Sequence, residues 1–306
     1  DYKLSLFNIN AQAFVPLNFK VLVIVKPTQP FSEIAKLKLD QYVMNGGKIL
    51  LFADRLNAEM DSLQIKNEVI AYDRGLQLND LVFKYGVRMN TDLVMDLQCD
   101  YLPFDVNGNG QFELLPWNYF PVLESKSNHP INKNLGFVSA RFSNSLDTVE
   151  AEGIKKTILL STSANARKIS APALISGKEN VAAAQEKFKT ANIPVAVLLE
   201  GKFNSLFANR TTQAMRDSIA AYGSSFLPQC ISENKMIIVA DGDIVLNSIV
   251  KGNQPIPMGM NPYTYGTQRE FPFANKEFLQ NCLDYLINEN GLSEAKGKDY
   301  VVRLLN

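Results

Sequence analysis

The chain has 306 residues, with 31 basic and 31 acidic side chains and a formal net charge of zero. A nucleic-acid partner normally requires a basic face, so this balance gives no support to one. No apolar run reaches the ~20 residues needed to cross a bilayer, and no signal peptide is recognisable. Because the chain begins at Asp1 without a methionine, we expect a soluble portion from the middle of a longer protein.

Residues 19–55 predict a strand, a helix and a second strand. The apolar runs at 19–25 and 48–53 are short and rich in β-branched residues, as expected of strands buried on both faces. Between them lies an amphipathic segment that Ser32 can cap at its start and Gly46 can end. Two strands joined through one helix run parallel, with a right-handed crossover.

Further elements of both kinds follow along the chain. In order, they are a helix at 76–85, short strands at 87–89 and 93–95, strands at 154–161, 193–199 and 235–240, and a helix from Asn275, its expected N-cap, to near Gly291. The stretch from 101 to about 143 is instead rich in turns and aromatic residues. We therefore predict an α/β fold with a mostly parallel, doubly wound sheet of the flavodoxin-like type, carrying a β-rich, turn-rich insertion.

These elements suggest three parts. Residues 1–100 form the first part of the α/β core, and residues 101–234 form an insertion or second subdomain with additional strands. Residues 235–306 return to the core.

Acidic residues follow two of the predicted parallel strands, at the edge where open α/β sheets bind ligands. Asp54 comes after the second strand, and Asp241 and Asp243 come after the strand at 235–240. Such carboxylates can chelate a divalent cation, or they can cap the turn that follows. We favour capping and expect no metal or cofactor, because no third acidic ligand is tied to Asp241 and Asp243 in sequence.

The stretch Asp105 to Phe112 resembles the opening of a calcium loop. The motif needs a bidentate glutamate at loop position twelve, where this chain has Pro116, and Glu113 comes three residues too early. Asn-Gly repeats also suit a tight hairpin, because both residues tolerate positive φ. We favour the hairpin and leave calcium binding open.

Nucleophilic catalysis has little support in the sequence. His129 is the only histidine, and neither a Gly-x-Ser-x-Gly nor a Gly-x-Cys-x-Gly turn is present. A P-loop and a G-x-G-x-x-G fingerprint are missing, so nucleotide binding is not indicated. We expect no enzyme, and we expect Cys99, Cys230 and Cys282 to be small apolar fillers, although one pair could be bridged in an oxidising compartment.

Six stretches also carry a family resemblance. They lie at 45–52, 129–131, 156–163, 195–203, 238–243 and 273–279, and the last two, with IVADGD and FANKEFL, are the most specific. With them the chain resembles the extracytoplasmic domain of the ABC-transporter auxiliary proteins of gliding bacteria, the GldG type. The resemblance implies a sheet related to class I amidotransferase-like and intraflagellar-transport-type domains, without their catalysis.

The same resemblance implies a location and partners. The parent protein would be anchored in the inner membrane of a Bacteroidetes-type bacterium, with this portion in the periplasm beside a permease and an ATPase. We therefore expect a non-catalytic binding or scaffolding domain of an ABC transport complex linked to gliding motility or secretion. The alternatives are a degenerate amidotransferase-like hydrolase using Cys99 or the Asp241/Asp243 pair, and a domain that captures a small ligand such as a sugar or peptide.

Two surfaces are candidates for the working part of the molecule. The first is the carboxyl edge of the sheet, near Asp54, Asp241, Asp243 and Asn275. The second is the aromatic insertion around Trp117, Tyr119 and Phe120, where we expect a partner protein to dock.

Overall fold

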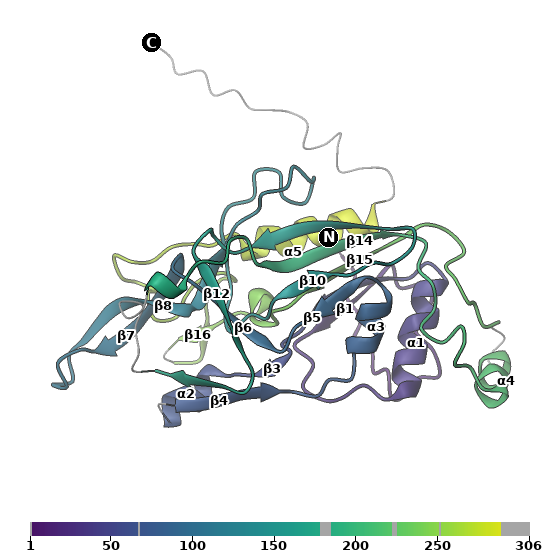
Figure 1. Cartoon of the computed structure of the whole chain (residues 1–306), viewed down its shortest axis with the longest axis horizontal. Coiled ribbons are helices and arrows are strands. Elements are labelled where there is room, and N and C mark those ends of the chain that lie inside the picture. The colour runs from purple at the N-terminus through teal and green to yellow at the C-terminus, as the bar shows by residue number, and fades with distance from the viewer. Residues whose placement is uncertain (1, 67, 178–184, 222–224, 251, 289–306) are drawn as a thin grey trace, which may run out of the picture.

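The computed structural model describes residues 2–66, 68–177, 185–221, 225–250 and 252–288 (Figure 1). The helices are α1 (Glu33–Met44), α2 (Met60–Lys66), α3 (Asn79–Lys84), α4 (Gln213–Ala221) and α5 (Asn275–Ile287), with 3₁₀ turns η1 (Gln185–Lys187) and η2 (Asp243–Val245). Across the described ranges, none of the helices combines the length and apolar character that a membrane span requires.

The strands are short and numerous. They are β1 (Val21–Val25), β2 (Lys48–Phe52), β3 (Leu56–Asn57), β4 (Glu68–Asp73), β5 (Val87–Met89), β6 (Asp92–Asp96), β7 (Cys99–Asp105), β8 (Phe112–Leu123), β9 (Val138–Ser139), β10 (Leu146–Thr148), β11 (Ile154–Ser161), β12 (Ala166–Ser170), β13 (Ala173–Ser176), β14 (Pro194–Gly201), β15 (Asn234–Val239), β16 (Ile249–Val250) and β17 (Gln254–Pro255). The fold is mixed α/β with a predominance of strands.

The central sheet has five strands in the order β1-β2-β15-β14-β11. The strands β1, β2 and β15 run parallel, and Ile49 of β2 is opposite Leu22 on one side and Met236 on the other. By contrast, β14 is antiparallel to both β15 and β11. The α/β class is thus confirmed, but the expected mostly parallel, doubly wound sheet is wrong: the parallel part is limited to three strands.

The predicted unit at 19–55 forms as its sequence indicates. The Ser32 hydroxyl accepts the Ala35 N–H at 3.2 Å and caps α1. Beyond the end of this helix, Gly46 has φ +91°, a conformation that favours glycine. The chain then returns as β2 beside β1.

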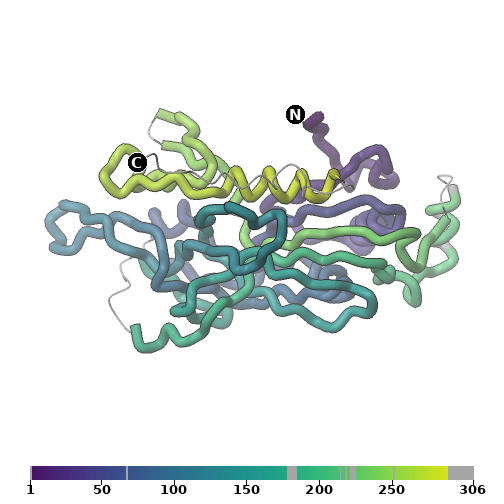
Figure 2. Tube along the Cα trace, turned by 90° about the horizontal axis from the view of Figure 1, so that it is seen from above, coloured from purple at the N-terminus to yellow at the C-terminus, as the bar shows by residue number. Residues whose placement is uncertain are grey.

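The two faces of the central sheet are covered by different helices. Alternate residues of β2 point to opposite faces, so Ile49 and Leu51 lie with α1 residues, whereas Leu50 and Phe52 lie with Phe278 and other residues of α5. Figure 2 shows α5 as a yellow coil along one side of the strands. The core is therefore two apolar layers separated by the sheet.

The second predicted helix and its strands form, but not where expected. The helix α3 is followed by Gly86 with φ +111°, and β5 and β6 follow it as predicted. These strands do not extend the central sheet; β5 pairs with β10 and β6 pairs with β12, both antiparallel. The range 56–74 holds α2 together with β3 and β4.

The strands formed by residues 101–234 belong to more than one sheet, which concerns the predicted division of the chain into three parts. The turn-rich portion forms the sheet β7-β8-β9, whose hairpin projects at one end of the molecule (Figure 1). Two further strands from this range, β11 and β14, belong to the central sheet. The division at 100 and 234 stays a prediction, and the central sheet draws strands from all three of the proposed parts. The predicted end of the last helix, near Gly291, lies outside the described residues.

Candidate functional site

Three carboxylates meet at the carboxyl edge of the central sheet. Asp54 lies two residues beyond β2, and Asp241 and Asp243 follow β15. Because β2 and β15 are adjacent and parallel, their ends bring one carboxylate oxygen from each residue within 4.8 Å of the others. The expected convergence of Asp54, Asp241 and Asp243 is present in the structure.

A lysine from the neighbouring strand end pairs with two of these carboxylates and with Glu59. Lys26 directly follows β1, and its Nζ lies 2.7 Å from Asp243 Oδ1, 2.9 Å from Glu59 Oε2 and 3.5 Å from Asp54 Oδ2. Burial lowers the pKa of Lys26, but the charges of Asp243 and Asp54 outweigh this effect and raise it above its ordinary value. The lysine therefore stays cationic at neutral pH.

The backbone is shaped to bring Lys26 and Gly242 together. Lys26 has φ +44°, which is unusual for a residue with a side chain. A Cβ on Gly242 would lie 2.7 Å from the Lys26 Cβ, too close for any other residue. Glycine at 242 is therefore required by the close approach of two strand ends.

A second cation and a fourth acid complete the cluster. The Arg74 guanidinium lies 2.7 Å from Glu59 Oε1 and 3.9 Å from Asp54 Oδ2. Burial raises the pKa of Asp54 to about 6; the charge of Asp243 adds to this shift, and Lys26 opposes it. Glu59 behaves in the opposite way: its hydrogen bond and ion pair with Lys26 overcome the effect of burial and lower its pKa.

Asp241 is buried and accepts hydrogen bonds from three groups at the carboxyl edge. It has no exposed surface, and its Oδ2 accepts the Arg141 backbone N–H and the Ser143 hydroxyl, each at 2.6 Å. Its Oδ1 accepts the Asp243 N–H at 2.8 Å, which is the capping interaction predicted from sequence. Burial, reinforced by the charges of Asp243 and Asp54, raises the pKa of Asp241 well above its ordinary value.

The chemistry of this donor set suits a hard divalent cation, which prefers carboxylate oxygens. However, the Lys26 ammonium already occupies the position between Asp54, Asp243 and Glu59. A metal ion would have to displace a charge that makes three contacts. We therefore assign the cluster a structural role, in which it ties the ends of β1, β2 and β15 together.

Asn275 connects the same edge to α5. Its Nδ2 donates to the Ser139 and Ile244 carbonyls, both at 2.8 Å, and its Oδ1 accepts the Ser139 N–H at 2.9 Å. Asn275 is the first helical residue, and Ala274 holds the N-cap position without a side-chain hydrogen bond. The expectation that Asn275 caps the helix is wrong, since its amide is used to join β9 and η2.

The aromatic residues of the insertion form a core. The side chains of Trp117 and Tyr119 are 1% and 6% exposed. The Trp117 ring lies 5.0 Å from that of Phe120 and 5.7 Å from that of Phe142, in edge-to-face geometry. The burial of both rings gives no support to the expected docking surface on Trp117 and Tyr119, which stays a prediction.

Burial shifts the pKa values of Cys99 and His129 in opposite directions. Burial, followed by the charges of Asp96 and Asp100, raises the pKa of the Cys99 thiol above its ordinary range. The His129 ring lies against Tyr285, 4.5 Å away, and burial lowers its pKa. All three cysteines are free, so the possible bridge is not formed.

Cys99 is expected to react slowly with a thiol reagent such as Ellman's reagent near neutral pH. A thiol with a raised pKa presents little thiolate, which is the reactive form. Mass spectrometry after brief labelling should show at least about tenfold slower modification of Cys99 in the folded chain than in urea. Equal rates would identify an accessible, activated thiol and would revive the hydrolase alternative.

The suspected calcium loop is the tip of the β7–β8 hairpin. Asp105 is opposite Phe112 in this pair. Its two carboxylate oxygens accept the Asn109 N–H at 3.2 Å and the Gly110 N–H at 3.1 Å. The hairpin interpretation is confirmed, with the side chain of Asp105 closing the turn.

A cleft of about 870 Å³ opens beside the carboxylate cluster. Its walls come from α2, from the segment 246–250 that includes β16, and from the loop around residues 259–265. The lining includes Arg141, Asp243, Ser248, Tyr263, Tyr265 and Asn275. Two of the residues predicted from sequence, Asp243 and Asn275, thus line a cavity that can admit a small molecule.

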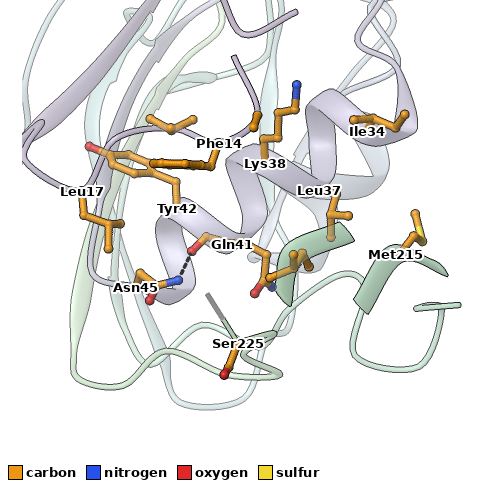
Figure 3. Close-up of a pocket in the computed structure, with 13 residues that line it drawn as sticks. Phe14, Leu17, Ile34, Leu37, Lys38, Gln41, Tyr42, Asn45, Met215 and Ser225 are labelled. Carbon is orange, nitrogen blue, oxygen red and sulfur yellow. Dashed lines mark hydrogen bonds between the residues drawn. The ribbon is translucent and has the colours of Figure 1, made fainter. Parts of the chain in front are cut away.

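A second depression of about 400 Å³ is mostly apolar. Figure 3 shows it between the N-terminal segment, with Phe14 and Leu17, the helix α1, with Ile34 and Leu37, and Met215 of α4. We call it the α1 groove. It was not predicted, because its three walls are far apart in sequence.

Sequence reasoning also missed Glu59, Arg74 and Arg141. It placed Lys26 at the carboxyl edge of the sheet but did not name it as a site residue. Lys26 directly follows a parallel strand, and this position was a usable signal. The same rule, that residues after parallel strands gather at the carboxyl edge of the sheet, identified Asp54 and Asp241. The positions of Glu59, Arg74 and Arg141 gave no such signal, since each lies on an irregular segment.

Comparisons with known proteins place the chain in a family. No curated protein matches the sequence. Among solved structures, one described as "mmIFT52 N-terminal domain" aligns with 90% of this chain and 80% of its own length, at 13% identity and a TM-score of 0.44. The sequence matches, over residues 1–282, the auxiliary family described as an ABC-type uncharacterized transport system, and the chain belongs to that family.

Proposed function

We propose that this chain is a non-catalytic binding and scaffolding domain that docks on the membrane permease of an ABC transport complex. Membership of the auxiliary family makes the permease and ATPase subunits of such a complex the expected partners. The periplasmic location and the link to gliding motility or secretion are part of the proposal, and they rest on the sequence resemblance to the GldG type.

The observation that carries the proposal is the apolar surface around the α1 groove. Leu17 of the N-terminal segment and Ile34, in the first turn of α1, line the groove and are 57% and 62% exposed. Phe14, at 50%, lies between them on the groove wall. Contiguous apolar surface of this kind is typical of a site for a protein partner. We assign the groove to an apolar segment of the permease.

The engagement of the polar groups at the sheet edge supports the non-catalytic part of the proposal. The Lys26 ammonium pairs with both Asp54 and Asp243, and the oxygens of Asp241 accept hydrogen bonds from Arg141, Ser143 and Asp243. A catalytic acid or base must instead be free to exchange a proton with a substrate.

The docking surface can be tested by co-purification of the permease with the full-length protein. The substitution Ile34→Asp places a charge on the groove wall and should reduce the recovered permease at least about tenfold, because burying an unpaired carboxylate is costly. The matched control is Ile65→Asp on α2, since Ile65 is 81% exposed and does not line the groove. Equal recovery with both variants would contradict the assignment.

The proposed location has a separate test. A cysteine introduced at Asn109, on the exposed hairpin tip, should react with a membrane-impermeant reagent in intact cells whose outer membrane has been permeabilised. Labelling only after cell lysis would place the domain on the cytoplasmic side.

A further inference from the structure

Arg141 presents its guanidinium to the cleft beside the carboxylate cluster. Its backbone N–H is fixed by Asp241, and its side chain lies over the Phe120 ring, 5.2 Å from the ring centre. One terminal nitrogen donates to the Ser248 hydroxyl at 3.1 Å. The guanidinium is thus held in place on the wall of the cavity by a ring on one side and a hydroxyl on the other.

The charge of this guanidinium is not paired in the part of the chain that the structure describes. Of the described carboxylates, none lies within 4.0 Å of Arg141, whereas Lys26, Arg55 and Arg74 each have such a partner. A guanidinium has five N–H donors, and among the described residues one of those of Arg141 has a hydrogen-bond acceptor. A half-buried, preorganised cation of this kind is suited to bind an anion.

The surrounding charges restrict which anion fits. Asp243 lines the same cleft and is paired with Lys26, and the exposed Asp61 lies at its rim. The buried carboxylate of Asp100 also interacts electrostatically with Arg141, which opposes the rise in the pKa of Asp100 that burial causes. These three acids would repel a phosphate dianion more strongly than a single carboxylate, whose planar geometry matches the guanidinium fork.

The remaining lining suits the organic part of a ligand. Tyr263 and Tyr265 offer ring faces and hydroxyls, and Met60 and Met260 contribute apolar surface. The Tyr263 hydroxyl already accepts the Gln64 side-chain amide, which fixes this ring at the wall. The cavity of about 870 Å³ is large enough for a small organic acid or the last residues of a peptide.

We propose that this cleft binds a monocarboxylate, with Arg141 holding the carboxylate and the two tyrosines contacting the attached organic group. The carboxylate can belong to a free organic acid or to the carboxyl terminus of a polypeptide. This site shares no lining residue with the α1 groove. A test of carboxylate binding is therefore independent of a test of the proposed docking function.

The test is calorimetric titration of the full chain with four probes. These are benzoate, the tripeptide Gly-Gly-Phe, the same tripeptide with an amidated carboxyl terminus, and inorganic phosphate. We expect saturable binding of benzoate, of the free tripeptide or of both below about 10 mM, and weaker binding of the amide and of phosphate. Binding of the tripeptide alone identifies a chain terminus as the ligand, and binding of benzoate alone identifies a free acid.

Variants then connect the binding to Arg141. The substitution Arg141→Gln should weaken carboxylate binding by about tenfold or more, because a charge-assisted bidentate contact is lost. Arg141→Lys keeps the charge and most of the stem, so it should fold and show an intermediate loss. The control is Arg88→Gln, because Arg88 is exposed, pairs with Asp147 and lies outside this cleft. Full binding by both Arg141 variants, binding of the amide equal to that of the acid, or no saturable binding of either carboxylate would overturn the proposal.

Discussion

Replacement of Trp117 by alanine is expected to lower the free energy of unfolding by about 3–5 kcal/mol. The indole is 1% exposed and is surrounded by Tyr119, Phe120 and Phe142, so truncation removes buried apolar surface and leaves a cavity. Urea unfolding followed by far-UV circular dichroism measures the change.

Phe112 provides the control for this prediction. It lies on the same strand, β8, but its side chain is 67% exposed. Phe112→Ala should change the free energy of unfolding by no more than about 0.5 kcal/mol. A loss of less than about 1 kcal/mol for Trp117→Ala would mean that the ring is not part of a packed core, and a partner-binding role for Trp117 would again be open.

Lys26→Met is expected to destabilise the fold by about 3–5 kcal/mol near neutral pH. The substitution keeps the length of the side chain but leaves Asp54 and Asp243 without their shared cation. Adding Asp54→Asn should recover part of the loss, because it removes one of the two unpaired charges. The control is Lys155→Met, an exposed lysine 3.7 Å from Glu200, for which a change within about 0.5 kcal/mol is expected.

The loss caused by Lys26→Met should decrease at acidic pH. In the native chain the pKa of Asp54 is raised to about 6 from the ordinary value of 3.8, so its ionisation costs stability as the pH rises through this interval. Removing the lysine raises this pKa further and also removes the stabilisation of ionised Glu59. The destabilisation should therefore be larger at about pH 7.5 than at about pH 4.5 in urea titrations. A loss that is independent of pH would show that Lys26 stabilises through packing alone.

The sequence predicts the first crossover well because the local signals agree. The Ser32 cap, the Gly46 stop and the two apolar runs all point to the same unit, and the structure contains it. It does not predict strand direction for β11 and β14, since the composition of a strand is the same whichever way the strand runs. The direction of each of these strands depends on the path of the long connection that leads to it, and a local stretch of sequence does not specify that path.

The meeting of acidic residues at the carboxyl edge was predictable from the sequence, whereas the ion pairs that they form there were not. Asp54 and Asp241 each follow a parallel strand, so their proximity follows from topology alone. The distances of Lys26 to Asp54, Asp243 and Glu59 depend on side-chain packing and on an irregular backbone conformation at Lys26 itself. This is why the sequence, which favoured capping over cation binding for these acids, did not predict the network of ion pairs that Asp54 and Asp243 form with Lys26.

The aromatic residues at 117–120 were predicted to lie on a binding surface, and the structure buries them. Their turn-rich surroundings suggested an exposed insertion, yet β8 is a twelve-residue strand, and most of its second half is buried. Composition alone does not separate aromatic residues that bind a partner from those that fill a small second core.

The α1 groove and the Arg141 cleft lie toward different ends of the molecule. In Figure 1, α1 and α4 are at the right, whereas α2, β16 and the β7–β8 hairpin are toward the left. Since the two depressions have no wall in common, occupation of one leaves the other open. With both proposed sites filled, the domain would hold one molecule toward each end, and the two molecules would not need to touch each other.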